Sequence, residues 1–112
     1  MIKVSFIIVA YNAAAHLVDL LSDLKKQTFD HKKIEVLLVN SNSTDKTEDI
    51  FEEFKNNNDF SECKLLQNPK KTLPAGWNVA LRNAEGEIIL RVDAHARMPD
   101  DFIEANVRNI EK

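Results

Sequence analysis

The chain is poor in glycine, and this scarcity excludes two common kinds of phosphate-binding loop. Only Gly76 and Gly86 occur among 112 residues, against an average usage of about 7%. A dinucleotide-binding Rossmann fingerprint and a Walker loop each need several glycines within a few residues. We therefore expect any bound phosphate to be held by side chains, by a metal ion or by a single helix N-terminus.

The sequence also lacks a cysteine pair, a membrane-spanning run and a surplus of basic residues. Cys63 is the only cysteine, so it has no partner for an internal disulfide and fits a reducing compartment. No apolar run approaches the ~18 residues of a membrane helix, and no signal-peptide pattern opens the chain. The net charge of −3 gives no reason to expect a nucleic acid as partner. We expect a cytoplasmic domain, held at the inner face of the membrane, if at all, by parts outside this chain.

What the sequence does contain is a regular alternation of apolar strands and amphipathic helices. Nearly continuous apolar runs predict buried strands at residues 4–10, 34–39, 64–67 and 87–92. Between and after them, apolar residues at helical spacing predict helices over about 13–27, 45–56 and 74–85, and from 99 onward. Crossovers of this length imply parallel strands. We predict an α/β fold: a Rossmann-like, mostly parallel sheet of about four strands, with helices on both faces.

Residues that start and end helices punctuate this pattern. Asn12 is placed to be the N-cap of the first helix, and Asp45 with Glu48 resembles a capping box for the second. Gly86 suits the position just after the third helix, where a left-handed residue is common. Pro99 suits the first turn of the last helix.

Polar residues collect where three of the predicted strands end. Residues 11–12 follow the first strand, 40–45 follow the second and 93–97 follow the fourth. In a parallel sheet these positions share one edge, which is where ligands bind in open α/β folds. Asp93 and His95 point the same way if the chain stays extended, which indicates a metal or phosphate site. Taken alone, however, the aspartate can simply cap a turn and the histidine can simply be exposed.

Five stretches of sequence together carry a resemblance to a known family. They are VSFIIVAYN (4–12), VNSNSTDKT (39–47), LPAGWNVAL (73–81), NAEGEIILRVDAHA (83–96) and MPDDF (98–102). They cover nearly the whole chain, which resembles the N-terminal half of the GT-A fold family 2 glycosyltransferases, users of nucleotide-diphosphate sugars. Residues 75–78 with 93–96 look most like bacterial exopolysaccharide enzymes of the succinoglycan-biosynthesis type. The resemblance implies that residues 1–112 are the N-terminal part of a GT-A domain.

The resemblance implies a divalent metal at Asp93 and His95. These residues match the family's D-x-D metal motif, with His95 in the place of the second aspartate. An ion there would bridge the two phosphates and neutralise the leaving diphosphate. Imidazole suits Mn²⁺, whereas Mg²⁺ prefers oxygen ligands, and both ions remain candidates. Alternatively, Asp93 faces the ribose or the sugar and His95 alone binds the metal.

The resemblance also implies a nucleotide-binding set. Tyr11 matches the aromatic residue that stacks on uracil, although a strand-end tyrosine can be merely half-buried. The family usually has aspartates where Asn40 and Ser41 stand, so the identity of the base is open, although an amide still offers both a donor and an acceptor. Asn12 can instead be only a helix cap, and Arg91 can instead be a strand residue paired with an acid. The whole set is Tyr11, Asn12, Asn40, Ser41, Asn78, Arg91 and Asp93.

A family 2 catalytic domain is much longer than this chain, so we expect the acceptor site and the general base to lie elsewhere. The resemblance implies an inverting transfer by a single in-line displacement, with a base opposite the leaving group. The acceptor would be a saccharide or a lipid-linked saccharide in cell-surface polysaccharide synthesis. We expect the isolated chain to be nearly inactive and to self-associate through an uncovered sheet edge.

Two other classes of protein share parts of this pattern. A non-catalytic α/β module of the receiver type places acids at strand ends, but it needs an acidic pair after the first strand, where residues 10–12 are Ala-Tyr-Asn. A nucleotidyltransferase also binds a metal and a nucleotide, but it usually has a glycine-rich loop where residues 13–15 are all alanine. The glycosyltransferase interpretation accounts for more of the chain than either alternative.

Overall fold

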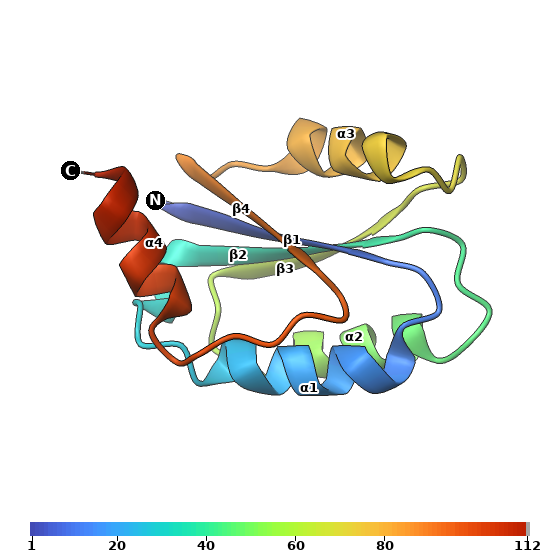
Figure 1. Ribbon diagram of the computed structural model, residues 1–112, viewed down its shortest axis with the longest axis horizontal. Helices are drawn as coiled ribbons and strands as arrows, with labels where there is room; N and C mark the ends of the chain where they lie inside the picture. Colours follow the sequence, from blue (N-terminus) through green and yellow to red (C-terminus); the bar gives the residue numbers. More distant parts are fainter. Residues whose placement is uncertain (112) are drawn as a thin grey trace.

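In the computed structural model, which describes residues 1–111, four parallel strands form one sheet with helices on both of its faces (Figure 1). This confirms the predicted fold class. Among the described residues, no helix has the length and apolar character needed to cross a membrane. The strands are β1 (Val4–Ala10), β2 (Ile34–Asn40), β3 (Glu62–Gln67) and β4 (Ile88–Asp93), and the helices are α1 (Ala14–Lys25), α2 (Thr47–Asn56), α3 (Leu73–Asn83) and α4 (Phe102–Ile110), with a short 3-10 turn at His31–Lys33.

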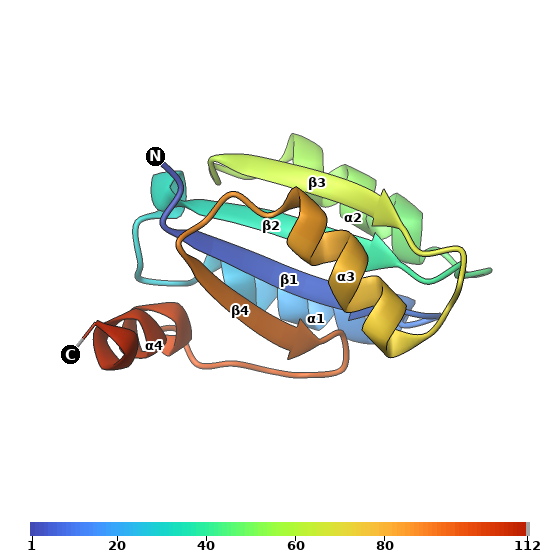
Figure 2. The same cartoon turned by 90° about the horizontal axis from the view of Figure 1, so that it is seen from above.

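The strand order β3-β2-β1-β4 puts the first strand in the interior of the sheet, beside the last one (Figure 2). The register sets Val9 of β1 opposite Val39 of β2 on one side and Asp93 of β4 on the other. The carboxyl ends of these three strands therefore share one edge. The chain winds outward through β2 and β3 and then crosses to the other side of β1. In α/β sheets, such a reversal opens a crevice at the carboxyl ends of the strands.

Both faces of the central strands are buried, which explains their nearly continuous apolar sequence. On β1, Phe6 and Ile8 pack toward α1, α2 and α4, whereas Ile7 packs toward α3, and all three are fully buried. Burying one such side chain contributes roughly 1.5–3 kcal/mol. The main helical contributors are Leu17, Leu20, Leu24, Phe51, Phe54, Ala80, Ile103 and Val107.

The start of α1 is capped by a distant loop and not by Asn12. The N-cap residue is Ala13, whose side chain makes no capping bond. The Ala13 amide donates to Thr47 Oγ1 at 3.2 Å, and the Ala14 amide donates to Asp45 Oδ2 at 3.2 Å. Asn12 has a φ of 46°, and its side chain accepts a bond from the same loop. The predicted cap was wrong because the free helix amides are satisfied by residues more than thirty positions away.

The predicted capping box of Asp45 and Glu48 is also absent from the described structure. Asp45 Oδ1 instead accepts from the Thr47 amide at 3.0 Å, within the turn that precedes α2. Glu48 Oε2 accepts from the Asn40 side chain at 2.7 Å. Both carboxylates therefore tie loops together at the carboxyl edge of the sheet.

The last helix begins three residues later than predicted, at Phe102 and not at Pro99. Gln27 accounts for the difference, because it bonds both sides of this start. Its Nε2 donates to Pro99 O at 2.7 Å, and its Oε1 accepts from the Ile103 amide at 2.9 Å. The segment around Pro99 is thus held by hydrogen bonds to Gln27, just after the end of α1.

The third helix starts as predicted but ends differently. Thr72 caps it with its side chain, and Pro74 lies in the first turn. The helix ends at Asn83, and Gly86 does not take the predicted left-handed conformation. A Cβ on Gly86 would lie 2.6 Å from the backbone nitrogen and from Oγ of Ser5. Glycine is therefore needed there for close approach to β1.

Candidate functional site

A cavity of about 310 Å³ opens at the carboxyl edge of the sheet, where the strand order reverses between β1 and β4. Four residues that were predicted from the sequence, Tyr11, Ser41, Asp93 and His95, lie there together. Each comes from the residues at or just after a strand end, as the topology requires. The full lining is Val9, Tyr11, Ser41, Lys71, Leu73, Asp93, Ala94 and His95.

Asp93 and His95 form a tight turn at the end of β4. Asp93 Oδ1 accepts from the His95 backbone amide at 2.7 Å and lies 2.9 Å from His95 Nδ1. The backbone bond first, and then the side-chain bond, lowers the pKa of the Asp93 carboxyl below its ordinary value. Asp93 is therefore ionised at neutral pH and is a good acceptor for a cation.

The same turn fits a divalent metal ion. Within residues 1–111, its bonds use Asp93 Oδ1 and His95 Nδ1, so His95 Nε2 is the ring atom available to a ligand. Nε2 faces away from Asp93, so in this arrangement the imidazole would bind the ion and Asp93 would orient the ring. The two side chains are 74% and 57% exposed, so an ion can reach them. An imidazole ligand suits Mn²⁺ better than Mg²⁺. A carboxylate that holds the other ring nitrogen is also the usual way in which a metal-binding histidine is oriented.

Tyr11 and Lys71 provide an aromatic face and a positive charge at the rim. The Tyr11 side chain follows β1 directly and is 57% exposed, which is unusual for a large ring beside a cavity. Lys71 has a φ of 63° in the loop that leads to α3. Together with Leu73, which the sequence analysis did not single out, these residues line the cavity.

Beneath the rim, Ser41 and Asn68 form a buried polar pair. Asn68 Nδ2 donates to Ser41 Oγ at 3.1 Å and to Thr72 O at 2.9 Å. Asn68 Oδ1 is buried and has no hydrogen-bond partner among the described residues. A buried acceptor left unpaired costs about 1–3 kcal/mol, which indicates that a donor from water or a ligand occupies it. Sequence reasoning missed Asn68, although its place directly after β3 follows the same strand-end rule.

Asn40 lies next to Ser41, but its side-chain amide already makes hydrogen bonds within the protein. Its Nδ2 donates to Glu48 Oε2 at 2.7 Å, and its Oδ1 accepts from the Ser43 amide at 3.0 Å. Only 3% of Asn40 is exposed. Its amide thus holds the β2–α2 loop in place, and its burial leaves little of the side chain within reach of a ligand.

Three other predicted residues lie outside the cavity. Asn12 joins the loops after β1 and β2, because its Oδ1 accepts from the Thr44 amide at 2.7 Å. Asn78 is on α3 and lines a separate hollow of about 160 Å³. The guanidinium of Arg91 lies over the Trp77 ring, 5.1 Å from its centroid. The structure therefore brings four of the predicted set together and leaves these three around them.

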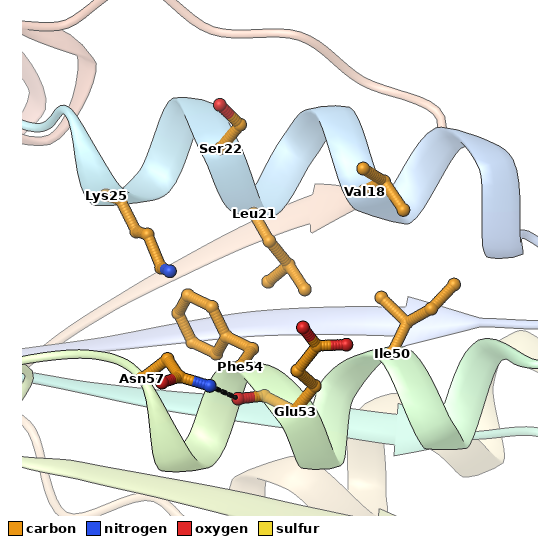
Figure 3. Close-up of a pocket in the computed structure, with 8 residues that line it drawn as sticks. All are labelled: Val18, Leu21, Ser22, Lys25, Ile50, Glu53, Phe54 and Asn57. Carbon is orange, nitrogen blue, oxygen red and sulfur yellow. Dashed lines mark hydrogen bonds between the residues drawn. The ribbon is translucent and has the colours of Figure 1, made fainter.

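A larger hollow, of about 480 Å³, lies between α1 and α2 (Figure 3). Leu21 and Phe54 point toward each other across it, and Lys25 reaches over the Phe54 ring at 5.7 Å from the centroid. Its wall is mainly apolar, with Glu53 as its carboxylate. It is a groove between two packed helices and lacks the clustered acid, imidazole and aromatic groups of the strand-end cavity.

Three carboxylates, those of Glu35, Glu62 and Glu85, also gather near the opposite edge of the sheet. Lys64 already supplies the cation there: its Nζ lies 3.2 Å from Glu35, 3.9 Å from Glu62 and 3.8 Å from Glu85. We therefore interpret this cluster as an ion-pair network that stabilises the fold.

Comparisons with known proteins identify glycosyltransferases as relatives of this chain. The chain is 38% identical to poly(ribitol-phosphate) beta-N-acetylglucosaminyltransferase TarS of Staphylococcus aureus over 106 residues, which are 92% of this chain and 17% of TarS. It is 31% identical over 98 residues to poly-beta-1,6-N-acetyl-D-glucosamine synthase of Staphylococcus epidermidis, which are 88% of this chain and 23% of the synthase. The chain thus spans less than a quarter of the length of either relative.

Solved structures of similar proteins share the fold. Residues 1–349 of TarS superpose with a TM-score of 0.88 at 31% identity over 98% of this chain and 32% of that one. The same TarS fragment in complex with UDP-GlcNAc gives a TM-score of 0.82 at 32% identity over 98% of this chain and 31% of the fragment. The mannosyltransferase PcManGT of Pyrobaculum calidifontis, in complex with GDP-Man and Mn²⁺, gives 0.86 at 29% identity over 95% of this chain and 31% of its own.

A family model also matches nearly the whole chain. The family described as "Glycosyl transferase family 2" matches residues 5–112, which include every strand apart from the first residue of β1, and the whole Asp93 turn. This match favours the glycosyltransferase interpretation over the receiver-like and nucleotidyltransferase alternatives. The chain belongs to glycosyl transferase family 2.

Proposed function

We propose that this chain is the N-terminal, donor-binding part of a glycosyltransferase that uses a nucleotide-diphosphate sugar. The observation that carries the proposal is the strand-end cavity, which brings Tyr11, Asp93 and His95 to one crevice. It is supported by the similarity to TarS, whose structure holds UDP-GlcNAc, and to PcManGT, whose structure holds GDP-Man and Mn²⁺.

In this proposal, each group at the rim of the cavity contacts a different part of the nucleotide-sugar donor. The exposed ring of Tyr11 stacks on the base, since every base offers a flat face to an aromatic ring. The ammonium of Lys71 lies where it can attract the diphosphate. His95, oriented by Asp93, would hold a divalent ion, Mn²⁺ in preference to Mg²⁺, which would supply positive charge against the leaving diphosphate.

We propose uracil as the base. Asn40, which stands where the family usually has an acid, has its amide engaged with Glu48 and Ser43. Asn68 donates to Ser41 Oγ and lines the hollow of about 160 Å³, and its buried Oδ1 has no partner among the described residues. The imide N–H of uracil is a donor of the kind that this oxygen lacks, and Asn68 would then be the base-reading residue.

The rest of the reaction is proposed from the family. The sugar would pass to a saccharide or lipid-linked acceptor with inversion at the anomeric carbon, in cell-surface polysaccharide synthesis at the cytoplasmic side of the membrane. Among the described residues that line the cavity, Asp93 is the one carboxylate. Since Asp93 is assigned to orienting His95, the general base would come from outside this chain, and the isolated chain would turn over little substrate.

Titration with nucleotides tests the proposal. UDP and GDP are titrated into the protein with and without Mn²⁺, by calorimetry. We expect UDP to bind more tightly with Mn²⁺ present, and Asp93→Asn and His95→Ala to remove that metal dependence. Tyr11→Ala should weaken UDP binding by about 1–3 kcal/mol, the usual value for stacking on a base.

The control is Val18→Ala, which changes a 52% exposed residue that lines the groove between α1 and α2. It should leave UDP binding unchanged. Equal binding of UDP and GDP would overturn the uracil proposal but retain the donor site. The absence of binding by either nucleotide, with the fold intact by circular dichroism, would overturn the donor site itself.

We also propose that the isolated chain self-associates through β4. Among residues 1–111, β4 pairs only with β1 and its other edge has no neighbour. Unpaired edges of this kind recruit other strands. Size-exclusion chromatography should show dimers or larger species that increase with concentration, and a monomer at all concentrations would contradict this.

A further inference from the structure

We infer that His16 is a positioning residue for His95: its ring braces the His95 imidazole so that Nε2 remains presented to the metal. The inference rests on the proposed function only for the identity of what Nε2 binds. The sequence analysis gave His16 no role, because its place in the first helix says nothing about the distant turn that it meets.

The two rings are in contact. Their centroids are 4.3 Å apart, and their planes are inclined at 46°. His95 Nδ1 lies 2.9 Å from Asp93 Oδ1. The imidazole is therefore held by a hydrogen bond at one nitrogen and by a neighbouring ring at its side, while the side chain as a whole remains 57% exposed.

His16 is mounted on a well-anchored element. It lies in the first turn of α1, where the amides at the helix start are bonded to Thr47 and Asp45 of the β2–α2 loop. The next residue, Leu17, is fully buried in the core. The backbone that carries the His16 ring is thus fixed relative to the strand ends.

The same face of α1 holds the segment beyond His95 at a second point. Asp23, seven residues or about two turns after His16, accepts from Arg97 Nε at 2.7 Å, from Arg97 Nη2 at 3.0 Å and from the Met98 amide at 3.1 Å. The Arg97 bond first, and the Met98 amide in addition, lowers the pKa of the Asp23 carboxyl. Helix α1 therefore fixes residues 95–98 at both ends.

This arrangement has a functional consequence for a metal-binding side chain that is half exposed, as His95 is. An exposed imidazole samples several rotamers, and binding an ion has to select one of them. A brace that restricts the ring before binding reduces that entropy loss, as groups around ligating histidines generally do. Phenylalanine has the size and planarity to keep this contact but cannot bind a metal, whereas alanine removes it.

The test compares His16→Ala, His16→Phe and a control, Val18→Ala, which changes a 52% exposed residue of the same helix. Mn²⁺ alone is the probe, and its affinity is measured by electron paramagnetic resonance. Nitrogen NMR of the metal-free protein reports the tautomer and the ring dynamics of His95. We expect His16→Ala to weaken Mn²⁺ binding about tenfold, the low end for groups that orient a metal-binding histidine.

His16→Phe and Val18→Ala should bind Mn²⁺ as the unmodified chain does. In the metal-free protein, His16→Ala should convert the single Nδ1–H tautomer of His95 into a mixture, and His16→Phe should not. A loss of affinity in His16→Phe as large as in His16→Ala would overturn the inference, because His16 would then be a ligand. An unchanged His95 tautomer in His16→Ala would overturn it too. If the unmodified chain binds no Mn²⁺, the proposed metal role fails, while the NMR comparison still decides the brace.

Discussion

Two carboxylates at opposite ends of the sheet, Glu35 and Asp93, show how differently one fold can use an acid. Asp93 follows the carboxyl end of β4 with 74% of its side chain exposed, whereas Glu35 near the amino end of β2 has none exposed. Glu35 Oε2 accepts from Ser5 Oγ at 2.5 Å and from the Glu85 amide at 2.6 Å, and Oε1 faces Lys64. One acid is open to a ligand and the other is enclosed by protein.

The pKa values of the two groups move in the same direction for different reasons. Burial raises the pKa of Glu35, but the Glu85 amide, Ser5 and Lys64 together bring it below its ordinary value of 4.5. The Asp93 pKa is lowered mainly by its bonds with His95. A cluster of acids therefore identifies a cation site only where no cation is already in place. In the cluster around Glu35, Oε1 makes no hydrogen bond among the described residues, but the Lys64 ammonium lies 3.2 Å from it and supplies the positive charge.

The largest expected effect is the loss of stability in Glu35→Ala. The substitution leaves a lysine that is 20% exposed, a hydroxyl and a backbone amide without their buried partner, and breaking such a pair costs on the order of 3 kcal/mol. Urea denaturation measures it. Glu62→Ala, which removes a half-exposed acid 3.9 Å from the same lysine, is the control and should change little. Equal losses in both variants would remove the distinction between the enclosed acid and its neighbours.

A smaller loss is expected for Gly86→Ala at the same end of the sheet. The new methyl would meet the Ser5 backbone at 2.6 Å, and forced overpacking of this kind costs about 1–3 kcal/mol. Gly76→Ala is the matched control, because its nearest neighbours are side-chain atoms of Asn68 and Val9 at 3.1 Å. Alanine also favours a helix by about 1 kcal/mol over glycine. Thermal unfolding should therefore give a clearly lower Tm for Gly86→Ala than for Gly76→Ala.

The decrease in the free energy of unfolding at acid pH should depend on Glu35. Because its folded-state pKa is lowered, its contribution is fully present above about pH 4.5 and is lost as the pH falls through the folded-state value. Glu35→Gln should be less stable at pH 7 and should lose less additional stability between pH 5 and pH 3. Urea titrations at each pH measure this, and parallel curves for the two proteins would contradict it.

The smallest expected effect on stability is that of Asp93→Asn. Its side chain is largely exposed, and surface substitutions usually change stability by less than about 0.5 kcal/mol. The same variant is expected to lose metal-dependent nucleotide binding. If Asp93→Asn unfolded as easily as Glu35→Ala, the open acid would be a structural one, and the contrast between the two edges would disappear.

The sheet and its strand-end residues could be predicted because both depend on local sequence. The apolar run of residues 4–10 and the strand-end position of Asp93 are visible without any knowledge of neighbours. The role of Glu35 was not visible, because it lies within an apolar run and its partners are 29 to 50 positions away. The same reason explains why Asn68 and His16 were missed: each gains its significance from a contact that only the folded chain creates.

The interior position of β1 also dictates the sequence of events during synthesis. Tyr11 leaves the ribosome long before Asp93, and β1 can pair with β2, and β2 with β3, while residues 88–93 do not yet exist. A nascent chain can therefore present the Tyr11 ring while one edge of β1 is still unpaired. The Asp93 carboxylate joins the cavity only when β4 pairs with β1, so the chain becomes able to bind a cation there only at this late step.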